Sequence, residues 1–235
     1  MRAADAICLI LTVLFAIGWL RSTFAPKEKR GSVDGDGRLV WTPETERIRD
    51  WSPERLPPIV DAFAGARPSF AEVAHHVADR MLAYADQFRA SGAALLVAAE
   101  GVDSSRLHTD TLCVFGAASD LVAHGTFGAA ATAERMTFSD HVVAHLISRL
   151  NDRAVGTGTA FAARYTEIQP SYANALVQFG NYKRGAWAIS QGLGLQDPLI
   201  RTAVGMAAGN ASGILYLDLL DLWEALNKAA REASP

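Results

Sequence analysis

The chain has 235 residues, of which 50% are hydrophobic and 20% charged, and its formal net charge is −3. This composition excludes an intrinsically disordered chain, which is poorer in apolar residues, and a small disulfide-stabilised protein, which needs more than two cysteines. It also argues against a general nucleic-acid-binding protein, because 22 Lys and Arg against 25 Asp and Glu leave no positive surplus for phosphates.

An apolar segment near the N-terminus, residues 3–20, predicts a transmembrane anchor. It reads AADAICLILTVLFAIGWL, and Asp5 is its single charge. At a helical rise of about 1.5 Å per residue the segment spans roughly 27 Å, close to the thickness of the hydrocarbon core of a bilayer. Trp19 suits the headgroup layer, and Arg21 ends the segment. We therefore predict a single-pass membrane protein in which residues 1–21 form a signal anchor.

A cleavable signal peptide is the alternative interpretation, because Thr23 and Ala25 match a small-residue cleavage site. Pro26 would then follow the scissile bond, where its ring hinders a peptidase, and Arg2 alone precedes Asp5. These features favour retention of the segment. Lys and Arg are more frequent after the segment than before it, so the positive-inside rule predicts that the globular part faces the cytoplasm.

Prolines distinguish the next part of the chain. Most of the nine prolines lie between Pro26 and Pro68, and proline breaks the interior of a helix. We therefore predict a Pro-rich tether with short helices over residues 22–68. Within it, residues 33–37 predict a turn and residues 38–41 a short strand. Thr42-Pro43 predicts the start of a short helix, since a capping hydroxyl precedes a proline.

Residues 69–235 show the pattern of an α-helical bundle. Ser69 and Glu72 match a capping box, and apolar residues then follow at three- and four-residue steps, namely Val73, Val77, Met81, Tyr84 and Phe88. Further helix starts are predicted at Asp103 or Ser104, Ser139, Ser171, Asp197 and Ser212, and stops at Gly101, Gly125 or Gly128, Gly156, Gly158, Gly192 and Gly194. The predicted fold is all-α, with a bundle of six or seven helices behind the anchor and tether.

Four residues form the strongest candidate metal site. His141 and His145 lie one helical turn apart, and Asp120 and His124 repeat that spacing on the preceding helix. If residues 125–138 form the loop of an antiparallel hairpin, His124 approaches His141 and Asp120 approaches His145, so four ligands for a divalent metal such as zinc converge. The alternative is that these polar residues join two helices by hydrogen bonds. A weaker second group consists of His75, His76 and Asp79.

Two further features predict interfaces. Gly205, Gly209 and Gly213 recur every four residues and form a flat stripe, and their polar neighbours favour a buried helix contact over a second membrane span. Aromatic residues and cations are interleaved from residue 165 to residue 187. That pattern suits a protein interface, and its central candidates are Tyr172, Tyr182 and Trp187.

The motifs favour a non-enzymatic role. The sequence has no serine nucleophile elbow and no phosphate loop, and Cys113 stands among apolar residues, as a buried core cysteine does. We predict a membrane-anchored interaction or scaffold subunit of a larger assembly, such as a secretion or transfer machine or an energy-transducing complex. It would contact lipid through residues 3–20 and bind other protein subunits, without a cofactor or nucleic acid. The alternative is a membrane-tethered metal-binding protein or hydrolase that uses the His and Asp residues on adjacent helices.

Overall fold

The computed structural model describes residues 38–63, 68–127, 132–179, 189 and 192–232. The predicted transmembrane anchor, residues 3–20, and the predicted turn at residues 33–37 therefore lie outside the described residues. Backbone contacts divide the chain into Met1–Val40 and Trp41–Pro235, and the second unit, called the helical body below, contains the helices of the described residues.

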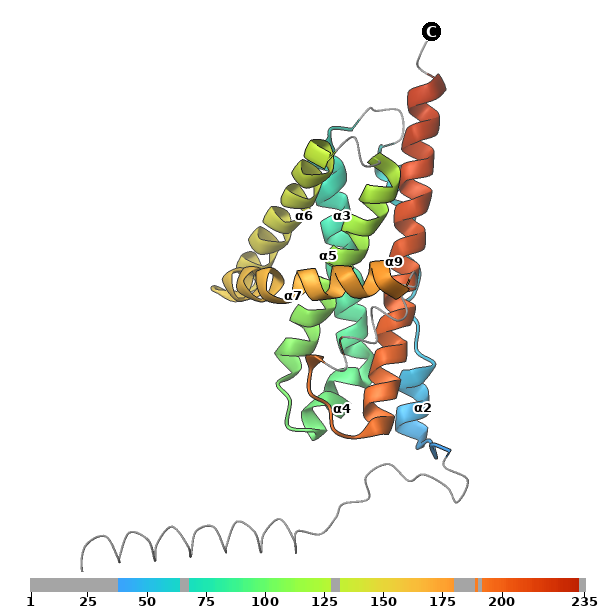
Figure 1. Cartoon of the computed structure of the whole chain (residues 1–235), viewed down its shortest axis with the longest axis vertical. Coiled ribbons are helices and arrows are strands. Elements are labelled where there is room, and N and C mark those ends of the chain that lie inside the picture. Colours follow the sequence, from blue (N-terminus) through green and yellow to red (C-terminus); the bar gives the residue numbers. More distant parts are fainter. Residues whose placement is uncertain (1–37, 64–67, 128–131, 180–188, 190–191, 233–235) are drawn as a thin grey trace, which may run out of the picture. The chain divides into compact units, whose positions relative to one another are not determined.

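The helical body is built from α-helices, which confirms the all-α prediction. In chain order its elements are α2 (Pro43–Arg49), the 3-10 helix η1 (Ile59–Phe63), α3 (Phe70–Phe88), the π-helical turn η2 (Arg89–Ala93), α4 (Ala94–Ala99), α5 (Ser104–Phe127), α6 (Thr132–Arg153), α7 (Thr157–Phe179) and α9 (Pro198–Glu232) (Figure 1). The described residues contain no strand, and in the segment predicted as one, residues 38–41, Leu39 alone forms a β-bridge.

Several helices begin at the capping residues that the sequence predicts. Before α3, the Ser69 hydroxyl accepts the backbone N–H of Glu72, and the Glu72 carboxylate accepts the backbone N–H of Ser69 at 2.7 Å. Thr42 caps α2 and Asp197 caps α9 in the same way, because a side-chain oxygen of each accepts a backbone N–H of the first helical turn. These contacts satisfy N–H groups that have no partner within the helix.

The helices are longer than predicted. The predictions of new helices at Ser139, Ser171 and Ser212 are wrong, because these serines lie inside α6, α7 and α9. Likewise α7 continues through Pro170. A serine or a single proline is a weak signal that packing of a long apolar face can override. The connections between helices are correspondingly shorter.

The core surrounds α3, which packs against α5, α6 and α9. The five apolar positions predicted for its inner face, Val73, Val77, Met81, Tyr84 and Phe88, are all buried. α7 packs across α5 and α6, while α9 lies along α3 and α5 and also contacts α2 (Figure 1). The repeated three- and four-residue spacing therefore identified the buried face of α3 correctly.

Residues 41–63, predicted as part of the tether, instead pack on the helical body. Ile48 of α2 and Ile59 of η1 are buried, and Trp51 stacks on Phe88 with 5.3 Å between ring centroids. Prolines prevent a long helix here, but they allow an extended strap, residues 51–58, that covers apolar side chains. The helical body accordingly begins at Trp41 and not at Ser69.

Candidate functional site

The predicted glycine stripe lies on α9 and is buried. Gly205, Gly209 and Gly213 are inaccessible, together with the small residues Ala203, Ala207, Ala208 and Ala211. Small side chains allow neighbouring helices to approach α9 closely. The segment Pro198–Ala229 is long and apolar enough to cross a membrane, yet 67% of its most apolar stretch is buried inside the helical body. That burial agrees with the prediction that this helix packs within the bundle.

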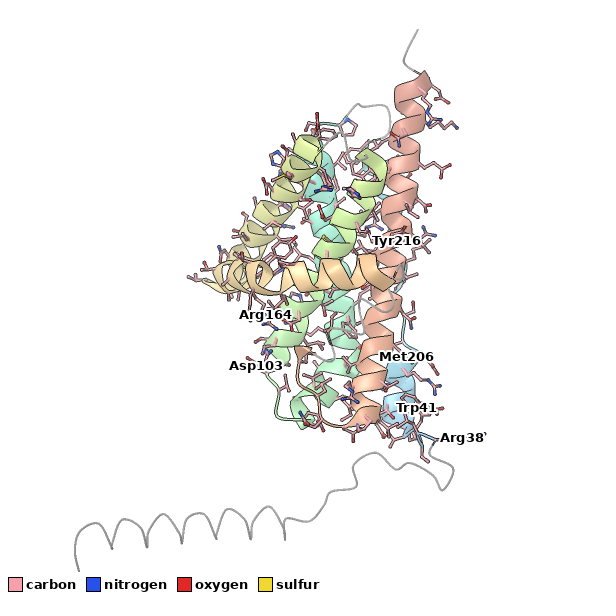
Figure 2. The ribbon with its side chains drawn as sticks, in the orientation of Figure 1. Arg38, Trp41, Asp103, Arg164, Met206 and Tyr216 are labelled. Atoms are coloured by element: carbon pink, nitrogen blue, oxygen red, sulfur yellow. The ribbon has the colours of Figure 1, made fainter. Side chains whose placement is uncertain are left out.

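The outer side of α9 carries an exposed apolar stripe, formed by Met206, Leu217 and Leu220. Their exposed fractions are 44%, 45% and 40%, and Met206 is labelled on α9 in Figure 2. At 3.6 residues per turn, Leu217 lies about three turns after Met206, and Leu220 lies about one turn after Leu217. The three side chains therefore share one face of α9. Gly213 lies on the same face between Met206 and Leu217 and is buried, so the stripe is exposed at its two ends and covered between them.

A buried carboxylate fixes α9 to α3 and to the strap. Asp218 accepts hydrogen bonds from Arg80 Nη1 at 2.9 Å, from the Tyr84 hydroxyl at 2.5 Å and from Arg55 Nε at 3.0 Å. Arg80 also donates to the carbonyl oxygen of Pro57. Burial and the hydrogen bond to Asp218 raise the pKa of Tyr84. Because the carboxylate is satisfied by two guanidinium groups and a hydroxyl, the network holds α9, α3 and the strap together.

An open groove of about 400 Å³ lies between the strap and α3. Pro57 and Pro58 contribute apolar surface from the strap, and His76, Asp79 and Arg80 contribute polar groups from α3. Arg80 is bonded to Asp218, and Asp79 accepts hydrogen bonds from α6. Two of the three polar groups that α3 supplies to the groove therefore already have partners within the protein.

The candidate metal ligands on α5 meet different residues of α6 from those predicted. Asp120 Oδ1 accepts a hydrogen bond from the Ser139 hydroxyl at 2.9 Å and lies 3.7 Å from Arg135 Nε. His124 Nδ1 contacts the guanidinium of Arg135. Both partners lie six residues earlier on α6 than the predicted ones. The reason is that α6 begins at Thr132, so the connection after α5 is shorter than the sequence suggested.

His145 faces α3 instead of α5. Its Nε2 lies 3.3 Å from Asp79 Oδ1, an oxygen that also accepts from Arg149 Nε at 3.0 Å, and its ring stacks on His75 with centroids 4.2 Å apart. In the described part of the chain, no three His, Cys, Asp or Glu side chains lie close enough together to hold a metal ion. The expected convergence of four ligands, Asp120, His124, His141 and His145, is therefore not found.

The contacts between α3 and α6 repeat one heptad further along. Asp86 lies seven residues after Asp79, accepts from Arg153 Nη1 at 3.1 Å, and lies 3.1 Å from His108 Nε2 of α5. Burial lowers the pKa of His108, although Asp86 acts in the opposite direction. Desolvation and the imidazoles of His145 and His141 lower the pKa of His75. The sequence did not predict the contacts of Asp79 and Asp86 with the neighbouring helices. The two acids are seven residues apart, but this spacing indicates a contact only when the helices that pack against α3 are known.

A second buried ion pair joins α5 to α7. Arg164 donates from Nε and Nη2 to the two carboxylate oxygens of Asp110, at 2.9 Å and 3.1 Å, and Asp110 is fully buried. The hydrogen bond with Asp110 raises the pKa of the Arg164 guanidinium. Cys113, one turn further on α5, is buried as predicted, and burial raises the pKa of its thiol. A thiol in this state is a core residue and a poor nucleophile.

The aromatic interface predicted between residues 165 and 187 is described only at its start. Tyr165 is half-buried, its ring lies 5.6 Å from that of Phe161, and it fills the space beside Gly116. Tyr172 belongs to α7, but its side chain lies outside the described part, as do Tyr182 and Trp187 entirely. That interface stays a prediction.

No known protein family, curated protein or solved structure matches the chain. The described residues form an α-helical body in which buried ion pairs join the helices. Its longest helix, α9, exposes an apolar stripe.

Proposed function

We propose that this chain is a membrane-tethered helical subunit that binds a helix of another membrane-associated protein along the exposed stripe of α9. The observation that carries the proposal is the alignment of Met206, Leu217 and Leu220 on one face of a continuous helix. The apolar segment at residues 3–20 supports the membrane tether, because its length and composition suit a transmembrane helix.

A helix is the partner that best fits this surface. The exposed ends of the stripe lie in one row along a continuous helix, and a facing helix presents side chains in such a row. Exposed acids, Asp221 and Glu224, lie beside its C-terminal half, so polar residues border the apolar row as in a helix-helix interface. α9 covers roughly 52 Å at about 1.5 Å per residue, which gives a partner room for several turns.

The stripe is also held rigidly. Asp218 is bonded to α3 and to the strap, and Asn210, one turn after Met206, donates from Nδ2 to the carbonyl oxygen of Trp51 at 2.8 Å. A surface that is already ordered loses little conformational entropy when a partner binds. This rigidity supports a docking role for α9.

Site-specific photo-crosslinking in membranes from the native cell tests the proposal. We expect a photoreactive residue at Leu217 to form a discrete adduct with another protein, and the same residue at Val155, which is fully exposed on the turn between α6 and α7, to form none. Leu217→Asp should abolish co-purification of that partner in mild detergent, whereas Val155→Asp should not. An adduct of twice the chain mass would identify a second copy instead, and lipid adducts alone would contradict protein docking.

A further inference from the structure

We propose that His75 and His145 form a pH-sensitive latch between α3 and α6. The latch holds the two helices together while His75 is neutral, and it loosens their junction when His75 binds a proton. The inference does not depend on the docking role of α9. It assigns a role to a histidine cluster that the proposed function leaves unused.

Four of the six histidines of the chain gather at the junction of α3 and α6. His75 and His76 belong to the second turn of α3, and His141 and His145 lie one turn apart on α6. The rings of His75 and His145 stack with 4.2 Å between their centroids and 20° between their planes. The nitrogens of an imidazole bind within the plane of the ring, so two stacked rings do not aim their nitrogens at one point. Binding of protons is therefore the chemistry that this arrangement favours.

The surroundings of His75 favour its neutral form. His141 and His145 face it from α6, and both are groups that bind a proton in the same pH range. Desolvation and these two imidazoles lower the pKa of His75, whereas Asp79 acts in the opposite direction. Further charged or titratable neighbours are Glu72 and His76 on α3 and, beside Asp79, Arg149 on α6. When all four histidines are protonated, five cations therefore face two acids.

Asp79 makes the two stacked rings respond differently to acid. Its Oδ1 lies 3.3 Å from His145 Nε2 and accepts from Arg149 Nε at 3.0 Å, so a proton on His145 is matched by a carboxylate. A proton on His75 then meets a charged imidazole at the distance of ring stacking, and like charges so close repel each other. His75 is exposed, so its side chain can turn into water. The first proton keeps the contact and the second one opens it.

The loosening should be confined to this part of the helical body. One heptad further along α3, Asp86 accepts from Arg153 Nη1 at 3.1 Å, and arginine stays protonated in proteins. The released form of His75 binds the proton more tightly than the stacked form. The latch is therefore closed above about pH 7 and opens as the pH falls below the ordinary histidine value of about 6.5.

Hydrogen–deuterium exchange of the full chain in detergent micelles, followed by mass spectrometry, tests the latch. Protection is compared at about pH 7.5 and about pH 5, after correction for the intrinsic exchange rate. Peptides from residues 133–147 of α6 report on the junction, and peptides from residues 203–215 of α9 report on the rest of the helical body. EDTA is present throughout, so that bound metal cannot cause a difference.

Three substitutions separate the proton on His75 from other effects of acid. His75→Phe keeps a stacking ring that does not titrate, and His75→Lys carries a positive charge at both pH values. His76→Lys is the matched control. It adds the same charge one residue away, at a position whose ring lies 4.9 Å from that of Phe63 and does not stack on His145.

Between about pH 7.5 and about pH 5 we expect the protection of α6 to fall on the order of tenfold more than that of α9. His75→Phe should remove this difference, and His75→Lys should produce it already at about pH 7.5. His76→Lys should behave as the unsubstituted chain does. An equal change in α6 and α9 would overturn the inference, because acid would then destabilise the whole body. The same fall in His75→Phe as in the unsubstituted chain would also overturn it, since another group would be responsible.

Discussion

Asp218 and Asp110 are acids buried among apolar side chains, and each is paired with an arginine on a neighbouring helix. A buried charge is costly unless hydrogen bonds and an opposite charge compensate it, so each pair acts as a unit. Around Asp218 the unit also includes Tyr84 and Arg55. At the scale of single residues, the position of α9 therefore depends on the charge of one carboxylate.

Asp218→Asn should destabilise the protein strongly. The amide keeps the shape of the side chain but leaves the buried guanidinium of Arg80 without its opposite charge, which costs roughly 3–5 kcal/mol. Asp221→Asn is the matched control. It removes the partner of the exposed Arg55 contact at 2.5 Å, which is worth less than about 1 kcal/mol. Chemical denaturation of the full chain in mild detergent, followed by circular dichroism, would measure both, and equal losses would contradict the account.

His108 predicts a pH dependence of stability. Burial lowers its pKa in the folded chain, so below the ordinary histidine value of about 6.5 the unfolded chain binds the proton more readily. The free energy of unfolding should therefore be highest above about pH 7 and fall as the pH drops through 6.5 toward the folded pKa. His75, whose pKa is also lowered, acts in the same direction.

His108→Gln should flatten this pH dependence between about pH 7.5 and 5, because glutamine does not titrate yet can still donate to Asp86. His108→Leu should flatten it equally and lower stability at every pH, since Asp86 loses one donor. Denaturation midpoints measured across the pH range provide the check. An unchanged slope in both variants would show that His108 is not the responsible group.

Helix contacts are closest where small residues allow it. Gly158 lies in the first turn of α7, its N–H donates to Asn151 Oδ1 at 2.9 Å, and a Cβ there would collide with the carbonyl oxygen of Ile147 and approach Asn151 Cγ to 2.8 Å. Because a backbone carbonyl cannot rotate away, α6 and α7 would have to separate. The geometry of this pair of helices therefore depends on the absence of one methyl group.

Gly158→Ala should cost about 1–3 kcal/mol, the usual range for overpacking. Gly125→Ala, in α5, is the control, because no heavy atom lies within 4 Å of its Cβ position. In that helix alanine should be neutral or stabilising by up to about 1 kcal/mol. Thermal unfolding would compare the two variants, and similar midpoints would argue against close packing of α6 and α7.

The sequence alone was sufficient to predict those features of the fold that depend on neighbouring residues in the chain. Ser69, Thr42 and Asp197 predicted helix starts correctly because a cap depends on residues within one turn. The partners of Asp120 and His124 were predicted six residues too late, because helix pairing depends on the length of the connection and on packing across the body. The contact of Asp79 with His145 joins residues 66 positions apart, and no local pattern specifies it.

At the scale of the whole molecule, the proposed protein combines a membrane tether at residues 3–20 with a helical body whose longest helix, α9, exposes apolar residues. These residues of α9 would bind a partner helix. This role requires that residues 3–20 remain attached to the mature protein. If that segment were removed, the surface on α9 would not be kept near a membrane.

The most direct test is therefore to determine the mature N-terminus and the membrane association of the native protein together. Membranes are washed with alkaline carbonate, and the intact mass of the chain is measured by mass spectrometry in the pellet and in the supernatant. We expect the chain in the pellet, with a mass that includes residues 3–20. A chain that begins after Ala25 and appears in the soluble fraction would contradict the central claim.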